Sequence, residues 1–278
     1  MPTYEFTAWL ALGSLAAGFL GSLTGLGGGV VIVPLLTLVF EVDLRYAIGA
    51  SLVSVIATSS GAAAAYVKEG YSNIRVGMVL EIATTFGALA GAVVAVLVPG
   101  SAVAVLFGVV LLLSAALQNY SRSERVSEGT PDRLAAWLRL PSTYPTPEGP
   151  RPYGVRHVPA GFGLMFVAGA LSGLLGIGSG ALKVLAMDQV MRLPFKVSTT
   201  TSNFMIGVTA AASAGVYLGR GYIDPGLVMP VMLGVLVGAL AGARVLATAP
   251  PRTLRLVFAL VIVALGIQMI YEGLTGGL

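Results

Sequence analysis

Ten apolar blocks run through this chain, and their lengths restrict its fold more than any other feature. A helix needs about 20 apolar residues to cross a bilayer, and roughly 17–25 are tolerated. Eight blocks fall in that range, at residues 7–24, 47–67, 76–98, 101–117, 159–176, 198–218, 225–248 and 253–271. Two more, at 29–40 and 181–191, are too short to cross unaided. The pattern predicts an all-α integral membrane protein.

The composition agrees with this prediction. Of 278 residues, 56% are hydrophobic and only 10% are charged, whereas about a quarter of a soluble domain is charged. The mean hydropathy is +0.90. A surface so poor in charge would not remain dissolved in water. Because residues 1–6 contain no Lys or Arg, we expect the first block to be a membrane helix and not a cleaved signal peptide.

Several kinds of chemistry are excluded by what the sequence lacks. It has no Cys, and its single histidine, His157, lies in a polar stretch. We therefore predict no catalytic residues, no metal site and no cofactor. The net charge of +4 comes from arginines that flank the apolar blocks, so it does not indicate nucleic-acid binding. No Gly-Lys-Ser/Thr signature is present, so ATP is not expected as an energy source.

The chain also repeats itself at a constant offset of 151 residues. The alignment has no gap over more than 80 residues, and it pairs Gly, Ser, Tyr and Pro positions that chance would not match. The pairs are Gly18 with Gly169, Ser51 with Ser202, Tyr66 with Tyr217, Gly70-Tyr71 with Gly221-Tyr222, Gly87–Ala92 with Gly238–Ala243 and Pro99 with Pro250. We predict two membrane repeats of about five helical segments each, at 7–117 and 159–278.

A polar stretch, residues 118–158, separates the repeats. Thr130-Pro131-Asp132 resembles a helix start, and residues 133–140 then give a short amphipathic helix that Pro141 ends. Leu and Trp on one face with flanking Arg indicate a helix in the headgroup layer. Residues 141–153 are rich in Pro and read as a linker. The alternative is a connector with no role beyond tethering.

The distribution of basic residues indicates the orientation of the repeats. If the first two blocks of each repeat leave and re-enter on one side, the repeats are inverted and the basic residues divide thirteen against two. One side then receives Lys68, Arg75, Arg122, Arg125, Arg133, Arg139, Arg151, Arg156, Arg192, Lys196, Arg244, Arg252 and Arg255, and the other Arg45 and Arg220. Parallel repeats would divide them nine against six. We expect inverted repeats, a cytoplasmic central loop and both termini outside.

Each short block follows a glycine-rich break at the same repeat position. The breaks are Gly25, Gly27, Gly28 and Gly29 in the first repeat and Gly176, Gly178, Ser179 and Gly180 in the second. A helix that begins inside the membrane presents unpaired N–H groups and a positive dipole end, which attract an anion. Glycine lets a ligand approach that backbone. We predict broken or re-entrant half-helices that bind one anion. Glycines can also serve close helix packing, which suits Gly18 and Gly87 better.

Polar residues near the breaks are further candidates for substrate binding. Thr24 and Ser179 border the breaks, and Ser51, Ser202 and Asn203 lie in the following helices. These side chains suit an oxyanion, although hydroxyls also bridge membrane helices. Lys183 lies inside an apolar block, where a cation is functional by default; the alternative is a side chain that reaches the headgroups. Glu81 is a candidate for proton coupling, or for pairing with Arg75.

The breaks, the duplicated Gly-Tyr loops and the GALAGA helices together resemble the TSUP family, also called the TauE/SafE sulfite exporter family. The matching stretches are residues 18–29 and 47–52 and their counterparts from Gly169 and Val197. The resemblance covers nearly all of both repeats but not the 118–158 loop. It implies an inner-membrane permease for sulfur-containing anions such as sulfite, thiosulfate, sulfonates or sulfo-carboxylates.

The leading hypothesis is a secondary active transporter of a small oxyanion that works by alternating access, with proton coupling as a variant of it. Inverted repeats with broken helices are a recurring way to build such a protein. The first alternative is an anion channel built on the same site. The second is an intramembrane enzyme, which the absence of a nucleophile–base pair disfavours. The expected partners are a small anionic substrate and the lipid bilayer.

Overall fold

Helices make up most of the residues that the computed structural model describes, which are 3–22, 28–68, 70–118, 132–146, 149–246 and 251–276. Two π-helical segments, η1 (Leu35–Val39) and η2 (Ala186–Val190), extend two of the helices. The strands are β1 (Ser142–Thr146) and β2 (Gly149–Tyr153). In these ranges the α-helices are α1 (Thr3–Ser22), α2 (Gly29–Pro34), α3 (Leu44–Lys68), α4 (Ile74–Leu97), α5 (Gly100–Gln118), α6 (Arg133–Trp137), α7 (Val158–Leu175), α8 (Gly180–Leu185), α9 (Phe195–Gly219), α10 (Pro225–Leu246) and α11 (Pro251–Thr275).

Each apolar block of the sequence corresponds to a helix, which confirms the all-α prediction. The two short blocks form α2 with η1 and α8 with η2. The two π-helical segments lie 151 residues apart, so both repeats change their helical pitch at the same place. Such wide turns occur frequently at functional sites.

The outer faces of the long helices are apolar, as a lipid environment requires. Ile74–Leu97, Val158–Leu175 and Pro225–Gly242 are long and apolar enough to cross a bilayer, and shorter apolar helices occur at Glu5–Gly21, Gly29–Val39, Gly100–Ala116 and Ala259–Thr275. On α10, one exposed stripe carries Met229, Leu233, Val237 and Leu240. On α4, the exposed face carries Met78, Ile82, Phe86 and Leu97.

Glycines bring the helices of the two repeats into close contact. α1 packs against α10 and α4 against α7, while α3 packs against α9 and α5 against α11. A Cβ at Gly18 would overlap the backbone of Val235, and one at Gly87 would overlap the backbone of Phe166. The interpretation of these two glycines as packing residues therefore fits their positions, because small residues let membrane helices approach closely.

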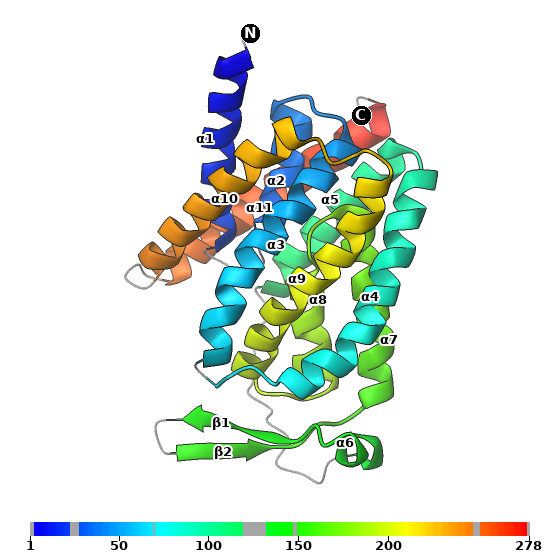
Figure 1. Cartoon of the computed structure of the whole chain (residues 1–278), viewed down its shortest axis with the longest axis vertical. Coiled ribbons are helices and arrows are strands. Elements are labelled where there is room, and N and C mark those ends of the chain that lie inside the picture. The colour runs from blue at the N-terminus through cyan, green and yellow to red at the C-terminus, as the bar shows by residue number, and fades with distance from the viewer. Residues whose placement is uncertain are drawn as a thin grey trace.

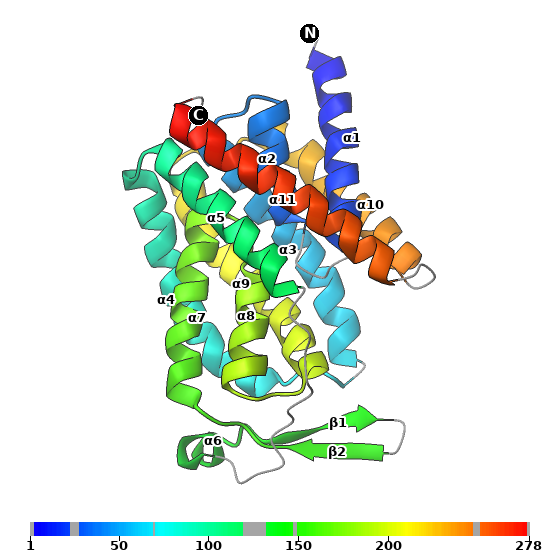
Figure 2. The ribbon, with the colours of Figure 1, turned by 180° about the vertical axis from the view of Figure 1, so that it is seen from behind.

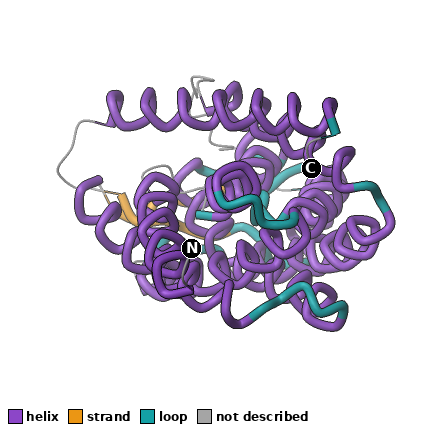
Figure 3. The backbone as a smooth tube through the Cα atoms, turned by 90° about the horizontal axis from the view of Figure 1, so that it is seen from above, coloured by secondary structure: helices purple, strands orange, loops and turns teal. Residues whose placement is uncertain are grey.

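The two ends of the molecule differ. The start of α1 and the end of α11 lie at one end, here called the terminal end, and the strands with α6 lie at the opposite end, here called the hairpin end (Figure 1). Residues of α2 and η1 return to the terminal end before α3 begins, whereas α8 and η2 return to the hairpin end before α9 begins (Figures 1 and 2). Seen from above, nearly all of the backbone is helix (Figure 3).

The central stretch is more ordered than its sequence indicates. Residues 142–146 and 149–153, expected to belong to a linker at 141–153, form two antiparallel strands, here called the hairpin, whose register pairs Ser142 with Tyr153. Proline suits this hairpin because it is tolerated on edge strands, and both strands here are edges. The helix expected at 133–140 begins at Arg133 and ends at Trp137; the expected start at Thr130 and Pro131 lies outside the described residues. Trp137 is 78% exposed, which leaves it free to contact headgroups.

Asn73 fastens the hairpin to the helices. Its side-chain oxygen caps α4 by accepting from the Val76 N–H at 3.1 Å. Its Nδ2 donates to the Leu140 carbonyl at 2.9 Å and to the Tyr153 hydroxyl at 2.7 Å. Burial raises the pKa of Tyr153 above its ordinary 10.0, against smaller opposing effects of the hydrogen bonds with Asn73 and Ser142. The docked hairpin therefore favours a neutral Tyr153.

Candidate functional site

The two glycine breaks meet inside the molecule. The Ser51 hydroxyl donates to the Gly176 carbonyl at 2.7 Å and lies 3.4 Å from the Gly29 carbonyl oxygen. A Cβ at Gly29 would lie 2.7 Å from Ser51 Oγ and 3.0 Å from the Gly176 oxygen, so this approach requires glycine. The structure thus joins the start of α2 to the end of α7. The other first-repeat candidates, Thr24, Gly25 and Gly27, lie outside the described residues.

The second break owes its shape to left-handed backbone conformations. Gly176 and Gly178 have φ of +70° and +71°, and Ser179, the residue before α8, has φ of +45°. Glycine adopts this region freely, whereas another residue pays about 1–3 kcal/mol for it. At the matching position the first repeat has Gly28 with φ of −63°. The second repeat therefore keeps a serine where the backbone favours glycine.

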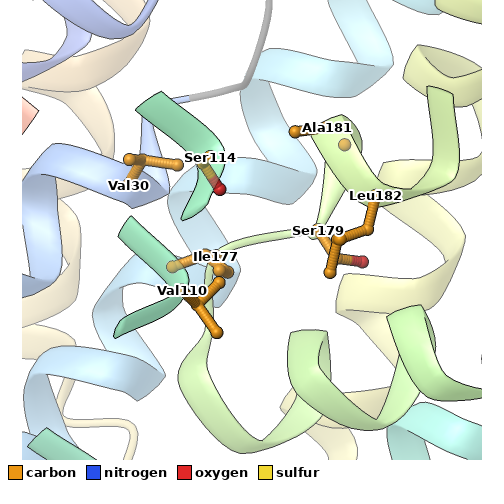
Figure 4. Close-up of a pocket in the computed structure, with 8 residues that line it drawn as sticks. Val30, Val110, Ser114, Ile177, Ser179, Ala181 and Leu182 are labelled. Atoms are coloured by element: carbon orange, nitrogen blue, oxygen red, sulfur yellow. The ribbon is translucent and has the colours of Figure 1, made fainter. Parts of the chain in front are cut away.

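The Ser179 side chain lies at a small buried cavity. Figure 4 shows it beside Ile177 and Leu182, with Val30 of α2 and Val110 and Ser114 of α5 on the other walls. Ser179 is 4% exposed, and within the described chain its hydroxyl oxygen has no hydrogen-bond partner. A buried hydroxyl without a partner costs free energy, so this one is available to a ligand.

The cavity is small. Its space for the centre of a water molecule is about 10 Å³, which is room for about one water. Residues of both half-helices line it, since Val30 belongs to α2 and Gly180, Ala181 and Leu182 belong to α8. A larger ligand could enter only if α2, α5 and α8 moved apart.

Ser51 and Ser202 occupy equivalent places in the two repeats. The Ser202 hydroxyl donates to the Gly180 carbonyl at 3.3 Å, as Ser51 does toward Gly29 and Gly176. Each hydroxyl therefore holds the first residue of a half-helix against α3 or α9, and its proton is used by the backbone. Asn203 follows Ser202 on α9 and is 9% exposed.

A second polar cluster joins Lys183, Thr209 and Glu81. Lys183 is fully buried, and its Nζ donates to Thr209 Oγ1 at 2.6 Å. Thr209 Oγ1 lies 2.7 Å from Glu81 Oε1, which also accepts from Thr85 at 3.3 Å. Lys183 therefore does not reach the headgroups. Nor does Glu81 pair with Arg75, whose Nη1 donates to the Arg139 carbonyl at 3.3 Å.

Two cation–tyrosine contacts occupy matching positions at opposite ends of the molecule. At the hairpin end, Lys196 Nζ lies 3.7 Å from the centre of the Tyr71 ring. At the terminal end, Arg45 lies 5.7 Å above the Tyr222 ring and donates to its hydroxyl at 3.3 Å. The offset of 151 residues relates Arg45 to Lys196 and Tyr71 to Tyr222, so each contact joins one repeat to the other.

The comparisons with known proteins decide the family. The family model described as "Sulfite exporter TauE/SafE" matches residues 10–269. The chain belongs to the TauE/SafE sulfite exporter family. The resemblance seen in the breaks and the GALAGA helices is thereby confirmed. As a TauE/SafE protein it is a multi-pass membrane transporter.

Individual relatives carry names of the same kind. The chain is 31% identical over 279 residues to "Probable membrane transporter protein YunE" of Bacillus subtilis strain 168, which covers 97% of this chain and 99% of that protein. It is 28% identical to "Probable membrane transporter protein YdhB" of the same organism, over 82% of this chain and 83% of the relative. "Probable membrane transporter protein MJ0441" of Methanocaldococcus jannaschii is 23% identical over 91% of both chains. No solved structure matches.

Sequence reasoning missed three parts of this TauE/SafE site. Thr209 could not be singled out, because hydroxyl residues are frequent along α9. The only available hint was that the buried charges Glu81 and Lys183 need a polar side chain between them. Ser114 lies in an otherwise apolar block, and only the fold brings it to the cavity. The cation–tyrosine contacts were visible as Gly-Tyr pairs but not as contacts. Among the described residues, no group of three or more His, Asp or Glu side chains could hold a metal ion.

Proposed function

We propose that this TauE/SafE protein is a secondary active transporter that carries a small sulfur-containing oxyanion by alternating access. The observation that carries the proposal is the meeting of the two broken helices at one small cavity. The family description names sulfite, and the proposal extends to the related anions thiosulfate, sulfonates and sulfo-carboxylates. The absence of ATP-binding signatures from the sequence leaves an ion or substrate gradient as the energy source.

The repeats are inverted in this proposal, and two observations support it. α1 runs away from the terminal end whereas α7 runs toward it, and α3 and α9 also run in opposite directions (Figures 1 and 2). The helix pairs that pack together also follow the repeat. Exchange of each helix for its counterpart in the other repeat turns the pair α1–α10 into α7–α4. The same exchange leaves the pairs α3–α9 and α5–α11 unchanged. A twofold axis produces this pattern of contacts. With basic residues inside, the hairpin end faces the cytoplasm and both termini face outward.

The substrate in this proposal lies between the two breaks. The anion would lie at the N-terminal starts of α2 and α8. Backbone N–H groups of Gly28 and Gly29 would face it from α2, and those of Gly178 and Gly180 from α8. The Ser179 hydroxyl would donate to an oxyanion oxygen, and that bond would offset the cost of its buried, unpartnered state. A sulfite-sized ligand exceeds the present cavity, so binding in this proposal requires the cavity to widen.

Alternating access needs one closure at each end, and the cation–tyrosine contacts fit this role. The Lys196–Tyr71 contact closes the hairpin end between α9 and the loop before α4. The Arg45–Tyr222 contact closes the terminal end between α3 and the loop before α10. Each contact is worth about 0.5–2 kcal/mol, which is small enough to break during every transport cycle.

Uptake into proteoliposomes tests this function. Purified protein should take up radiolabelled sulfite or thiosulfate with saturation, and an internal unlabelled anion should stimulate uptake by counterflow. Single-channel currents would instead show an anion channel. Absence of uptake of sulfite, thiosulfate and methanesulfonate by folded protein would refute the proposal.

A pair of variants drawn from the repeat locates the site. Ser179→Gly copies Gly28, relieves the left-handed backbone and removes the free hydroxyl. Loss of a hydrogen bond to a charged ligand costs about 1.5–3 kcal/mol, so the half-saturating anion concentration should rise by roughly 10- to 100-fold. Ser198→Ala is the matched control because it copies Ala47 and removes a buried, unpartnered hydroxyl that does not line the cavity. Uptake by the control should stay within about twofold of wild type.

A further inference from the structure

The Glu81–Thr209–Lys183 cluster exists in only one half of a duplicated fold. The offset of 151 residues places Met232 opposite Glu81, Ile32 opposite Lys183 and Thr58 opposite Thr209. Thr58 and Thr209 bond to the backbone in the same way, at 3.0 Å to Ser54 and 2.9 Å to Met205. Only Thr209 also bridges two charged side chains. Met232, Ile32 and Thr58 thus form an uncharged counterpart of this cluster within the same chain.

This comparison separates folding from function. Ile32 is completely buried, so the architecture tolerates an apolar side chain where the other repeat has Lys183. A buried ion pair is on average no more stabilising than well-packed apolar residues, and ionisable groups inside membranes mark substrate or proton pathways. Folding therefore does not require Glu81 and Lys183, and their retention in one repeat calls for another role.

The cluster is placed to respond to a ligand at the second break. Lys183 follows Ser179 by one helical turn, and its N–H donates to the Ser179 carbonyl. Glu81 lies on α4 of the first repeat, whereas Lys183 and Thr209 lie on α8 and α9 of the second. Any event that removes Lys183 from this cluster would loosen α8 from α4.

We propose that the substrate anion and Glu81 compete for the Lys183 ammonium through Thr209, and that Glu81 takes up a proton when the anion wins. The proposal rests on the proposed function and names its coupling device. Before binding, the cluster holds one carboxylate and one ammonium. After binding, a monovalent anion faces the ammonium and the carboxyl is neutral. The cluster has zero net charge in both states, so one proton crosses with each monovalent anion.

Among the described residues, the other charged groups on elements near Glu81 have partners of their own, which leaves Lys183 as the group that exchanges with it. Glu81 Oε2 is buried and, within the described chain, has no hydrogen-bond partner, so it offers a place for the proton. α5 and α7 carry no titratable side chain. On the neighbouring elements, Arg75 bonds to the Arg139 carbonyl, Lys196 lies over Tyr71 and Asp188 accepts from Gln189.

The test replaces the two charged residues by the uncharged residues at the equivalent positions of the repeat. The double variant Glu81→Met with Lys183→Ile reproduces Met232 and Ile32, so it should melt at or above the temperature of wild type in detergent. Each single variant leaves one buried charge unpaired and should melt several degrees lower. In proteoliposomes, an inward proton gradient should accelerate sulfite uptake by wild type, and the double variant should show no such acceleration.

Thr209 has its own matched control. Thr209→Val should reduce gradient-driven sulfite uptake at least tenfold and change the number of protons taken up per sulfite, measured with an internal pH dye. Thr209→Ser should restore both. Thr58→Val removes the equivalent backbone bond and should leave uptake and proton number within about twofold.

Four outcomes decide the question. Gradient-driven uptake by the double variant at the wild-type rate would overturn the proposal, as would a double variant that melts below both single variants, since the pair would then be structural. An unchanged proton number in Thr209→Val would remove Thr209 from the exchange. Absence of sulfite, thiosulfate and methanesulfonate uptake by wild type would refute the proposed function itself, and the coupling with it.

Discussion

Replacement of Gly176 by alanine tests whether the second break packs against α3 as described. Gly176 has φ of +70°, a conformation that costs an L-residue about 1–2 kcal/mol. A Cβ there would also lie 2.8 Å from Ile48 Cγ2 and 3.2 Å from the Ile48 carbonyl oxygen. Overpacking of this kind costs about 1–3 kcal/mol. Gly176→Ala should therefore destabilise the protein by about 2–5 kcal/mol.

The assay is thermal unfolding of purified protein in detergent, followed by intrinsic fluorescence or by light scattering. A loss of about 2–5 kcal/mol lowers the melting temperature by several degrees or more in a chain of this size. Gly163→Ala is the control, because Gly163 lies on the same helix, α7, and a Cβ there meets nothing within 4 Å. That substitution should be neutral or slightly stabilising, since Ala favours helix more than Gly does. Equal melting of Gly176→Ala and wild type would refute the described backbone conformation of Gly176 and its close packing against Ile48 of α3.

Three further predictions concern the closures and the docked hairpin. Lys196→Met should weaken closure at the hairpin end by about 0.5–2 kcal/mol, so a single engineered cysteine near that end should react roughly 2- to 30-fold faster; an unchanged rate would contradict the closure. Asn73→Ala removes a helix cap and two bonds to the hairpin, so limited proteolysis at 142–153 should become faster, and unchanged digestion would contradict docking. Because burial raises the pKa of Tyr153, docking should be constant below pH 10, where the residue is neutral in both states, and weaken above it; Tyr153→Phe should abolish this pH dependence.

Much of the fold follows from the sequence because membrane helices depend on simple quantities. Block length predicts which segments are helical, since every backbone group in lipid must bond within its own helix. The repeat places the two short blocks, the two serines Ser51 and Ser202, and the packing glycines in equivalent positions before any coordinates are known. The hairpin at 142–153 was not predictable, because its proline-rich strands resemble a linker and are held by Asn73 from a distant helix.

The candidate site was predictable at the level of segments but not of contacts. The breaks and the short helices were found from glycine spacing, and both half-helices line one cavity. The contacts of Lys183 could not be predicted, because its sequence position does not reveal which helix its long side chain reaches. In the described conformation it reaches Thr209 and does not line the cavity, so the competition proposed for it requires this side chain to turn toward the second break. Which residue this side chain contacts depends on how α4, α8 and α9 pack together.

The most direct test of the central claim uses a single cysteine at the cavity. The sequence contains no Cys, so Ser179→Cys carries the only thiol and needs no prior removal of others. If the two broken helices enclose a substrate site that opens alternately, membrane-impermeant maleimide should label this cysteine from either side of the membrane, and methanesulfonate, a candidate anion that does not consume maleimide, should slow both reactions. Labelling from neither side, or labelling that methanesulfonate leaves unchanged, would contradict the claim.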